Sequence, residues 1–223
     1  STGTNILDQY PVADPEKEGN DQTYRLVLKK ISSNERSCDY LHLGPHEPST
    51  TSEESASTRR KMGWENATLA SGAKAMLIKY GGGGSKSKEQ NNDTKGEKEE
   101  GYNKNKAQQS QSLFVLAVMA ANEKLDWKKI KKIIPGSKKQ TKNARMANVE
   151  EVWEVTACKP GAVPPFGSLF NVPTLMDRSL KKQGDIINFN CGLRTRSIQM
   201  TIQDYLAIEN PEICDFVVVV VHE

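Results

Sequence analysis

The chain is poor in the residues that support metal or redox chemistry. Its 223 residues include four cysteines and three histidines, and the cysteines form no Cys-x-x-Cys pair. This spacing predicts neither a zinc site nor a dense disulfide framework, and it favours a reducing compartment. The sequence also contains no Gly-x-Ser-x-Gly element and no plausible Cys–His–Asn set. We therefore expect no metal, no cofactor and no protein nucleophile.

Long apolar runs are also missing. The longest ones, at residues 113–121 and 216–221, fall far short of the roughly 20 residues that a membrane span needs. The first residues contain no charged-then-apolar leader. Only 36% of the chain is hydrophobic. These features predict a soluble cytoplasmic protein without a membrane partner, built on a single core with a substantial disordered fraction.

Positive charge is concentrated in one segment. The formal net charge is only +3, but residues 124–145 hold nine basic residues and one acidic residue. Such a block is typical of a surface that faces a polyanion, although a solvated helix face is the simpler interpretation. On the first interpretation, the residues that would contact a polyanion are Lys128, Lys129, Lys131, Lys132, Lys138 and Lys139.

The first half of the chain predicts a strand, a helix and a hairpin. Residues 23–31 alternate between apolar and charged side chains, which predicts a half-buried strand. Residues 51–61 read as a helix that starts with a capping box, Thr51 to Glu54. Apolar strands are expected at 74–80 and 113–119, paired across a polar, low-complexity insertion at about 81–111 that we expect to be disordered.

The second half predicts shorter elements. One helix is expected after Asp126 and another after Asn148, with inner faces formed by Trp127, Ile130, Ile133 and Ile134 and by Val149, Val152, Trp153 and Thr156. Strands are expected near residues 174, 186 and 197, then a helix at 201–208 and a last strand at 216–221. Because strands and helices do not alternate regularly, the order favours a mixed α/β fold over a doubly wound sheet.

A glycine and proline loop, Cys158-Lys-Pro-Gly-Ala-Val-Pro-Pro-Phe-Gly167, is the most distinctive segment. Pro164 and Pro165 stiffen the backbone, whereas Gly161 lets another group approach the main chain closely. Such a loop can bind a small polar group through its amides. The alternative is a plain turn between a helix and a strand.

Several segments together resemble the YbaK and prolyl-tRNA synthetase editing-domain family. They are, in chain order, His46-Glu47-Pro48, Gly72-Ala73-Lys74-Ala75, GAVPPFG at 161–167, residues 173–180 and residues 187–192. The resemblance covers roughly residues 40–215. It implies a single twisted, mixed sheet that curls around a pocket and is flanked by helices. We expect an editing domain at residues 23–223, preceded by an N-terminal extension at 1–22.

The resemblance also implies roles for individual residues. Lys74 matches the family's functional lysine, on a strand that faces the substrate. The Gly161–Pro165 loop matches a Gly-x-x-x-Pro element whose main-chain amides position the ester. The implied catalytic set is Lys74, Gly161, Ala162 and Val163, and the implied substrate-binding set is His46, Pro164, Pro165, Phe166, Asn190 and Gly192.

The activity implied by the resemblance is hydrolysis of a mischarged aminoacyl-tRNA by water. The long form of the loop is most similar to members that clear alanine from proline tRNA, while other members clear cysteine, serine or threonine. The expected partner is the aminoacylated 3′ end of tRNA, with prolyl-tRNA synthetase or a synthetase complex as a further candidate. The alternative is a non-catalytic tRNA-binding or synthetase-appended domain with the same fold.

Overall fold

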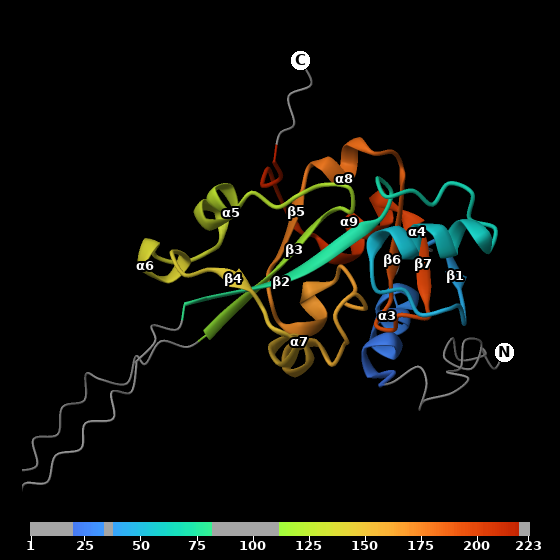
Figure 1. Ribbon diagram of the computed structural model, residues 1–223, viewed down its shortest axis with the longest axis horizontal. Helices are drawn as coiled ribbons and strands as arrows, with labels where there is room; N and C mark the ends of the chain where they lie inside the picture. Colours follow the sequence, from blue (N-terminus) through green and yellow to red (C-terminus); the bar gives the residue numbers. More distant parts are fainter. Residues whose placement is uncertain (1–19, 34–37, 82–111, 219–223) are drawn as a thin grey trace, which may run out of the picture.

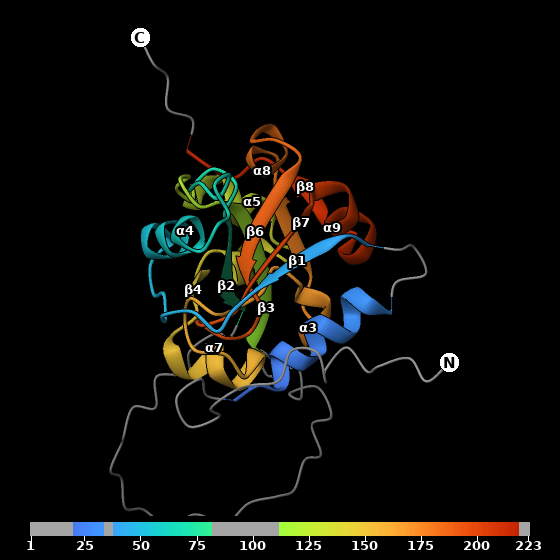
Figure 2. The ribbon, with the colours of Figure 1, turned by 90° about the vertical axis from the view of Figure 1, so that its right-hand side faces the viewer.

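The computed structural model describes residues 20–33, 38–81 and 112–218 (Figures 1 and 2). The predicted N-terminal extension and the polar insertion lie almost wholly outside these residues. The elements are α3 (Gln22–Ser32), β1 (Tyr40–Leu43), α4 (Ser52–Lys61), β2 (Ala73–Gly81), β3 (Ser112–Ala120), α5 (Trp127–Ile133), α6 (Lys138–Thr141), β4 (Arg145–Met146), α7 (Val149–Thr156), a 3-10 helix (Gly167–Phe170), β5 (Thr174–Asp177), α8 (Ser179–Lys182), β6 (Ile186–Asn190), β7 (Ser197–Thr201), α9 (Ile202–Glu209) and β8 (Glu212–Cys214).

The mixed α/β class is confirmed, but the strands form two sheets where one was expected. One sheet has the order β1-β7-β6 and is antiparallel. The other has the order β4-β2-β3-β5-β8, antiparallel from β4 to β3 and parallel from β3 to β8. The sheets meet where Asn188 donates its amide hydrogen to the Ser71 carbonyl, 2.8 Å away, beside an isolated bridge to Gly72. This single bridge is too short to make one continuous ladder.

The predicted hairpin is confirmed. Strands β2 and β3 pair from Ala73 opposite Ala120 to Gly81 opposite Ser112. Strand β3 is covered on both faces, because Val115, Ala117 and Met119 belong to one apolar cluster and Leu116, Val118 and Ala120 to the other. A strand buried on both faces reads as a continuous apolar run, which explains why the sequence identified it clearly.

The strand predicted at residues 23–31 is wrong, since this segment forms helix α3. Its buried residues Tyr24, Val27, Leu28 and Ile31 follow the helical spacing i, i+3, i+4, i+7, whereas Leu26 is 38% exposed. Tyr24, Leu26 and Leu28 also fit a spacing of two. The helical pattern prevails because it buries one whole face against the core.

Helix α4 and its capping box are confirmed, as is the Asp126 cap of α5. The inner face predicted for α7 is partly wrong. Val152 and Thr156 are buried, but Val149 and Trp153 are 59% and 46% exposed. A helix of eight residues has room to bury only a narrow stripe.

The C-terminal segment differs from the expected strand at 216–221. The last strand of the sheet is β8, and Val217 makes only an isolated bridge with Leu125. Residues 219–221 lie outside the described part of the chain. Over the residues that the structure describes, no helix has the length and apolar character needed to cross a membrane.

Candidate active site

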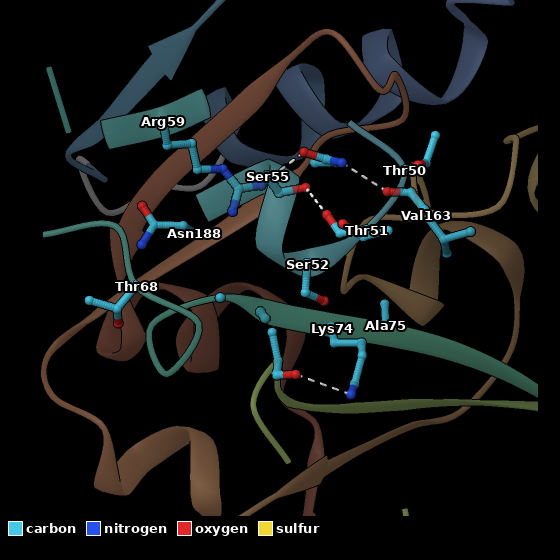
Figure 3. Close-up of a pocket in the computed structure, with 15 residues that line it drawn as sticks. Thr50, Thr51, Ser52, Ser55, Arg59, Thr68, Lys74, Ala75, Val163 and Asn188 are labelled. Atoms are coloured by element: carbon cyan, nitrogen blue, oxygen red, sulfur yellow. Dashed lines mark hydrogen bonds between the residues drawn. The ribbon is translucent and has the colours of Figure 1, made fainter. Parts of the chain in front are cut away.

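A cavity of about 210 Å³ opens between helix α4, the start of β2, the Gly161 loop and strand β6 (Figure 3). Its lining contains hydroxyls, amides and two cations but no carboxylate. In the described ranges, no cluster of three His, Cys, Asp or Glu side chains could hold a metal ion. The lining residues are Thr50, Thr51, Ser52, Ser55, Arg59, Thr68, Gly72, Ala73, Lys74, Ala75, Ala121, Gly161, Val163, Asn188 and Asn190.

Helix α4 presents a polar face to this cavity. Ser52, Ser55 and Arg59 follow the spacing i, i+3, i+7, so they lie on one side of the helix. The helix begins at Thr51, whose hydroxyl accepts the Glu54 amide hydrogen in a capping box. The inner face of a surface helix is usually apolar. Three polar residues there form a polar wall of the cavity.

Arg59 is the buried centre of the polar wall. Its Nε donates to Ser197 Oγ at 3.0 Å and its Nη2 donates to Asn190 Oδ1 at 2.8 Å. The residue is only 4% exposed, and it forms no ion pair with any described carboxylate. Burial lowers the pKa of Arg59 to about 10, so the guanidinium stays charged at neutral pH. Sequence analysis missed Arg59, although the polar spacing along α4 was a signal.

Asn190 joins Arg59 to the glycine loop. The Oδ1 atom of Asn190 accepts the Arg59 hydrogen bond, and Nδ2 donates to the Gly161 carbonyl at 2.9 Å. Asn190 was predicted near the pocket, and the structure places it in the cavity wall. His46 lies one step further away, because it is buried against Ser197 at 3.0 Å and does not line the cavity.

The Gly161 loop contains two main-chain amides without a hydrogen-bond partner in the described part of the chain. They belong to Gly161 and Val163, which line the cavity. The Ala162 amide instead donates to the Lys159 carbonyl at 3.0 Å. Gly161 has φ +86°, and a Cβ there would lie 3.2 Å from the Thr50 carbonyl oxygen. Both the positive φ and this close contact favour glycine at the position.

The remaining predicted loop residues support the loop from behind. Pro164, Pro165 and Phe166 are buried and do not line the cavity. The Pro165 carbonyl accepts the Tyr205 hydroxyl hydrogen at 2.8 Å. The Gly192 amide donates to the Ala162 carbonyl at 2.9 Å, on the side facing α3. These residues hold the loop in place and leave its other side to the cavity.

Lys74 lines the cavity, and its ammonium is bound by two main-chain carbonyls, one of them from the lining residue Ala121. Nζ donates to the Glu123 carbonyl at 2.7 Å and to the Ala121 carbonyl at 3.3 Å. Burial lowers the pKa of Lys74, while Glu53 and Glu123 act in the opposite direction. In Figure 3 the Lys74 side chain leaves β2 on the side away from Ser52, and the Ala75 side chain leaves it toward α4.

Only four of the six lysines predicted to bind tRNA are exposed to solvent. Lys128, Lys132, Lys138 and Lys139 are exposed. Lys129 and Lys131 are half-buried, because their ammonium groups donate to the Val217 carbonyl at 2.7 Å and to the Lys142 carbonyl at 3.0 Å. Figure 1 shows α5 and α6 toward one end of the molecule and α4 toward the other. The lysines therefore form a surface separate from the cavity.

Comparison with known families decides the affiliation of this chain. The aminoacyl-tRNA editing domain profile matches residues 94–208, which is more than half of the sequence. The chain belongs to the aminoacyl-tRNA editing domain family. A curated relative, the multifunctional Ser/Thr-tRNA deacylase ProXp-y of Escherichia coli K12, is 34% identical over 102 residues. That alignment covers 46% of this editing domain chain and 58% of the relative, so the chain spans less than two thirds of the relative's length.

Solved structures share the fold of this editing domain. One is a protein assigned provisionally as a trans-editing enzyme for prolyl-tRNA synthetase, with TM-score 0.59, 18% identity, and coverage of 89% of this chain and 98% of that chain. Another is a scaffold protein from epitope backbone grafting by computational design, with TM-score 0.59, 16% identity, and coverage of 90% and 100%. At these identities the likeness establishes the fold alone.

Proposed function

We propose that this editing domain hydrolyses the ester bond of a mischarged aminoacyl-tRNA in the cytoplasm. The observation that carries the proposal is the free amide pair of Gly161 and Val163 at the edge of a cationic cavity without a carboxylate. Hydrolysis of an acyl ester develops negative charge on the carbonyl oxygen. Fixed amide donors stabilise that charge without having to change protonation state.

Water is the nucleophile in this mechanism. Its oxygen adds to the ester carbonyl carbon while the carbonyl oxygen becomes an oxyanion at the loop amides. The bond from that carbon to the terminal ribose oxygen then breaks. One proton of the attacking water ends on the ribose oxygen, the other passes to solvent, and the free amino acid leaves as a carboxylate. Lys74 would add positive charge at the rim, where burial already lowers its pKa.

The cavity lining favours an amino acid with a hydroxyl group. Six polar side chains face the space beside the loop, namely Thr50, Thr51, Ser52, Ser55, Thr68 and Asn188. Five of them already have hydrogen-bond partners in the protein, whereas the Ser52 hydroxyl has none among the described residues. A seryl or threonyl hydroxyl could pair with Ser52, and an alanyl group could not. The E. coli relative is named a Ser/Thr-tRNA deacylase, which supports this choice over the alanine that the sequence favoured.

The nucleic acid partner would be the acceptor end of tRNA, held in part by the exposed lysines of α5 and α6. Prolyl-tRNA synthetase is a further candidate partner, since one structural neighbour is described as a trans-editing enzyme for that synthetase. This partner would be tested by co-purification of the two proteins with tRNA present and absent.

Single-turnover deacylation of a panel of charged tRNAs tests the function. We would prepare tRNAs carrying serine, threonine, alanine, cysteine and proline, and measure the loss of the aminoacyl group with excess enzyme. We expect seryl- or threonyl-tRNA to be hydrolysed fastest, with alanyl- and cysteinyl-tRNA slower. If alanyl-tRNA were hydrolysed faster than seryl- and threonyl-tRNA, the proposed preference for a hydroxyl-bearing amino acid would be wrong. Binding of tRNA without hydrolysis of any of them would identify a non-catalytic module instead.

A further inference from the structure

We propose that Arg59 is a further catalytic residue of this cavity, and that its free Nη1 donates to the ester carbonyl oxygen as that oxygen becomes negative. The inference rests on the proposed ester hydrolysis and assigns a residue to it. Three observations carry it: a free donor, an uncompensated charge and a fixed orientation.

The free donor follows from the hydrogen bonds of the guanidinium. Nε and Nη2 of Arg59 are taken by Ser197 and Asn190, while Nη1 has no partner in the described part of the chain. Among described side chains, the only fully enclosed nitrogen or oxygen without a partner is Ser179 Oγ. Nη1 is therefore not sealed in the core. Since Arg59 lines the cavity and is otherwise buried, Nη1 opens into the cavity.

The charge of Arg59 has no counter-ion among the residues that the structure describes. All of its partners are neutral, and none of the fifteen residues that line the cavity is acidic. A buried cation without an anion is costly, because desolvation is not repaid by an ion pair. A ligand that develops negative charge beside Nη1 would offset this desolvation cost.

The orientation of the guanidinium is fixed before any ligand binds. A planar group with two of its nitrogens anchored to β6 and β7 cannot rotate, so the direction of Nη1 is set by the protein. Asn190, which anchors Nη2, also holds the Gly161 carbonyl. The Asn190 side chain therefore fixes the position of Arg59 relative to the Gly161 loop. Preorganised donors of this kind are what stabilise an oxyanion.

Lys74 is less well placed for the same task. Two of its three ammonium hydrogens are directed at the Ala121 and Glu123 carbonyls. Arg59 has no such competing acceptor at Nη1. Arg59 on α4 is therefore the cation directed into the cavity, and Lys74 on β2 lies at its rim.

The first test compares Arg59→Gln and Arg59→Lys with a matched control on the same helix. Arg60 is exposed and donates to the Ala67 carbonyl at 2.8 Å, so Arg60→Gln removes a guanidinium that does not line the cavity. In single-turnover deacylation of seryl-tRNA, we expect both Arg59 variants to lower the maximal rate about 10²- to 10³-fold, with substrate affinity within a few-fold. We expect Arg60→Gln to retain the wild-type rate. A raised KM with an unchanged rate would indicate a phosphate contact and overturn the proposal.

The second test separates catalysis from a purely structural role. We would measure binding of two unreactive analogues of the charged 3′ end, a neutral amide and an anionic phosphonate. Arg59→Gln should weaken phosphonate binding at least ten-fold more than amide binding. Equal weakening of both would mean that Arg59 only maintains the shape of the site, and the proposal would fail.

Two safeguards keep these outcomes distinct. If both Arg59 variants fail to fold, as judged by thermal melting, the wild-type protein still decides, because it must bind the phosphonate more tightly than the amide. Equal affinities would refute the oxyanion contact. If the wild-type protein hydrolyses no charged tRNA, the proposed function fails, whatever the Arg59 variants do. Hydrolysis by the wild type with an unaffected Arg59→Gln rate refutes the role of Arg59 alone.

Discussion

The molecule carries two basic regions that differ in every physical respect. Around the cavity, one buried guanidinium is fixed by two hydrogen bonds and is paired with no acid in the described part of the chain. On α5 and α6, four lysines extend into solvent with no described partner for their ammonium groups. The lysine cluster is easily recognised in the sequence, whereas Arg59 is not. A charge that is buried and held in a fixed geometry can act directly on a reacting group. Several exposed charges together create a long-range electrostatic field.

The difference predicts different responses to salt. Exposed charges are screened over about 8–10 Å at ordinary ionic strength, but buried ones are much less affected. Docking that depends on the lysines should weaken as salt rises. The chemical step that depends on the cavity should not.

After the Arg59 variants, the largest effect is expected at Lys74, whose exposure lies between that of the two regions. Lys74→Met should lower single-turnover deacylation on the order of 10²-fold while the fold persists, if its charge acts on the oxyanion. Circular dichroism and thermal melting would control for folding. A wild-type rate would leave the electrostatic role to Arg59 and remove Lys74 from the catalytic set.

Rigidity behind the loop is tested by two glycines with the same backbone angle. Gly192 and Gly63 both have φ +98°, but a Cβ on Gly192 would lie 2.6 Å from the Tyr24 amide nitrogen, whereas one on Gly63 meets nothing within 4 Å. Gly192→Ala should cost about 2–4 kcal/mol of unfolding free energy and Gly63→Ala about 1 kcal/mol. Urea titration measures both. Equal losses of unfolding free energy in the two variants would show that the backbone around Gly192 can shift to accommodate a Cβ.

The lysine surface is tested by salt dependence. Replacing Lys128, Lys132, Lys138 and Lys139 with glutamine removes exposed charges but keeps the contacts of Lys129 and Lys131. If all four contact phosphates, the log–log slope of tRNA affinity against salt should flatten by about three. Lys181→Gln with Lys182→Gln on α8 is the control and should have little effect. An unchanged slope in the fourfold variant would place the docking surface elsewhere.

The smallest expected effect is a dependence of stability on pH. Burial, Arg196 and His46 lower the pKa of His42 from 6.5 to about 4. The unfolded chain therefore takes up this proton first, and stability is lost as pH falls from about 6.5 toward 4. Thermal melting of wild type and His42→Gln at pH 7.5 and 5 should show a smaller loss in the variant. The fourfold lysine variant should match the wild type, and an identical loss in all three proteins would exclude His42 as a cause.

Sequence analysis was most successful where one local rule decides the structure. The Thr51 capping box, the Asp126 cap and the β2–β3 hairpin each follow from residues close together in the chain or from a continuous apolar run. It failed for α3, where the apolar residues fit two periods at once. The choice between those periods is made by tertiary burial, which a local pattern does not contain.

The site was predicted in part for the same reason. The resemblance located Lys74, Asn190 and the Gly161 loop, and all three reach one cavity. It did not locate Arg59, whose partners Ser197 and Asn190 are 138 and 131 residues away in sequence. A polar network of that span is assembled only when α4 packs against β6 and β7. Which loop residues face the cavity and which face the core also depends on this packing.

The most direct test asks whether chemistry and docking reside in separate regions. Deacylation would be measured on seryl-tRNA and on a short seryl ester of adenosine, for wild type, Arg59→Gln and the fourfold lysine variant. We predict that Arg59→Gln loses activity on both substrates and that the lysine variant loses activity on seryl-tRNA alone. Loss of short-ester hydrolysis in the lysine variant, or its retention in Arg59→Gln, would contradict the assignment of the chemistry to the cavity.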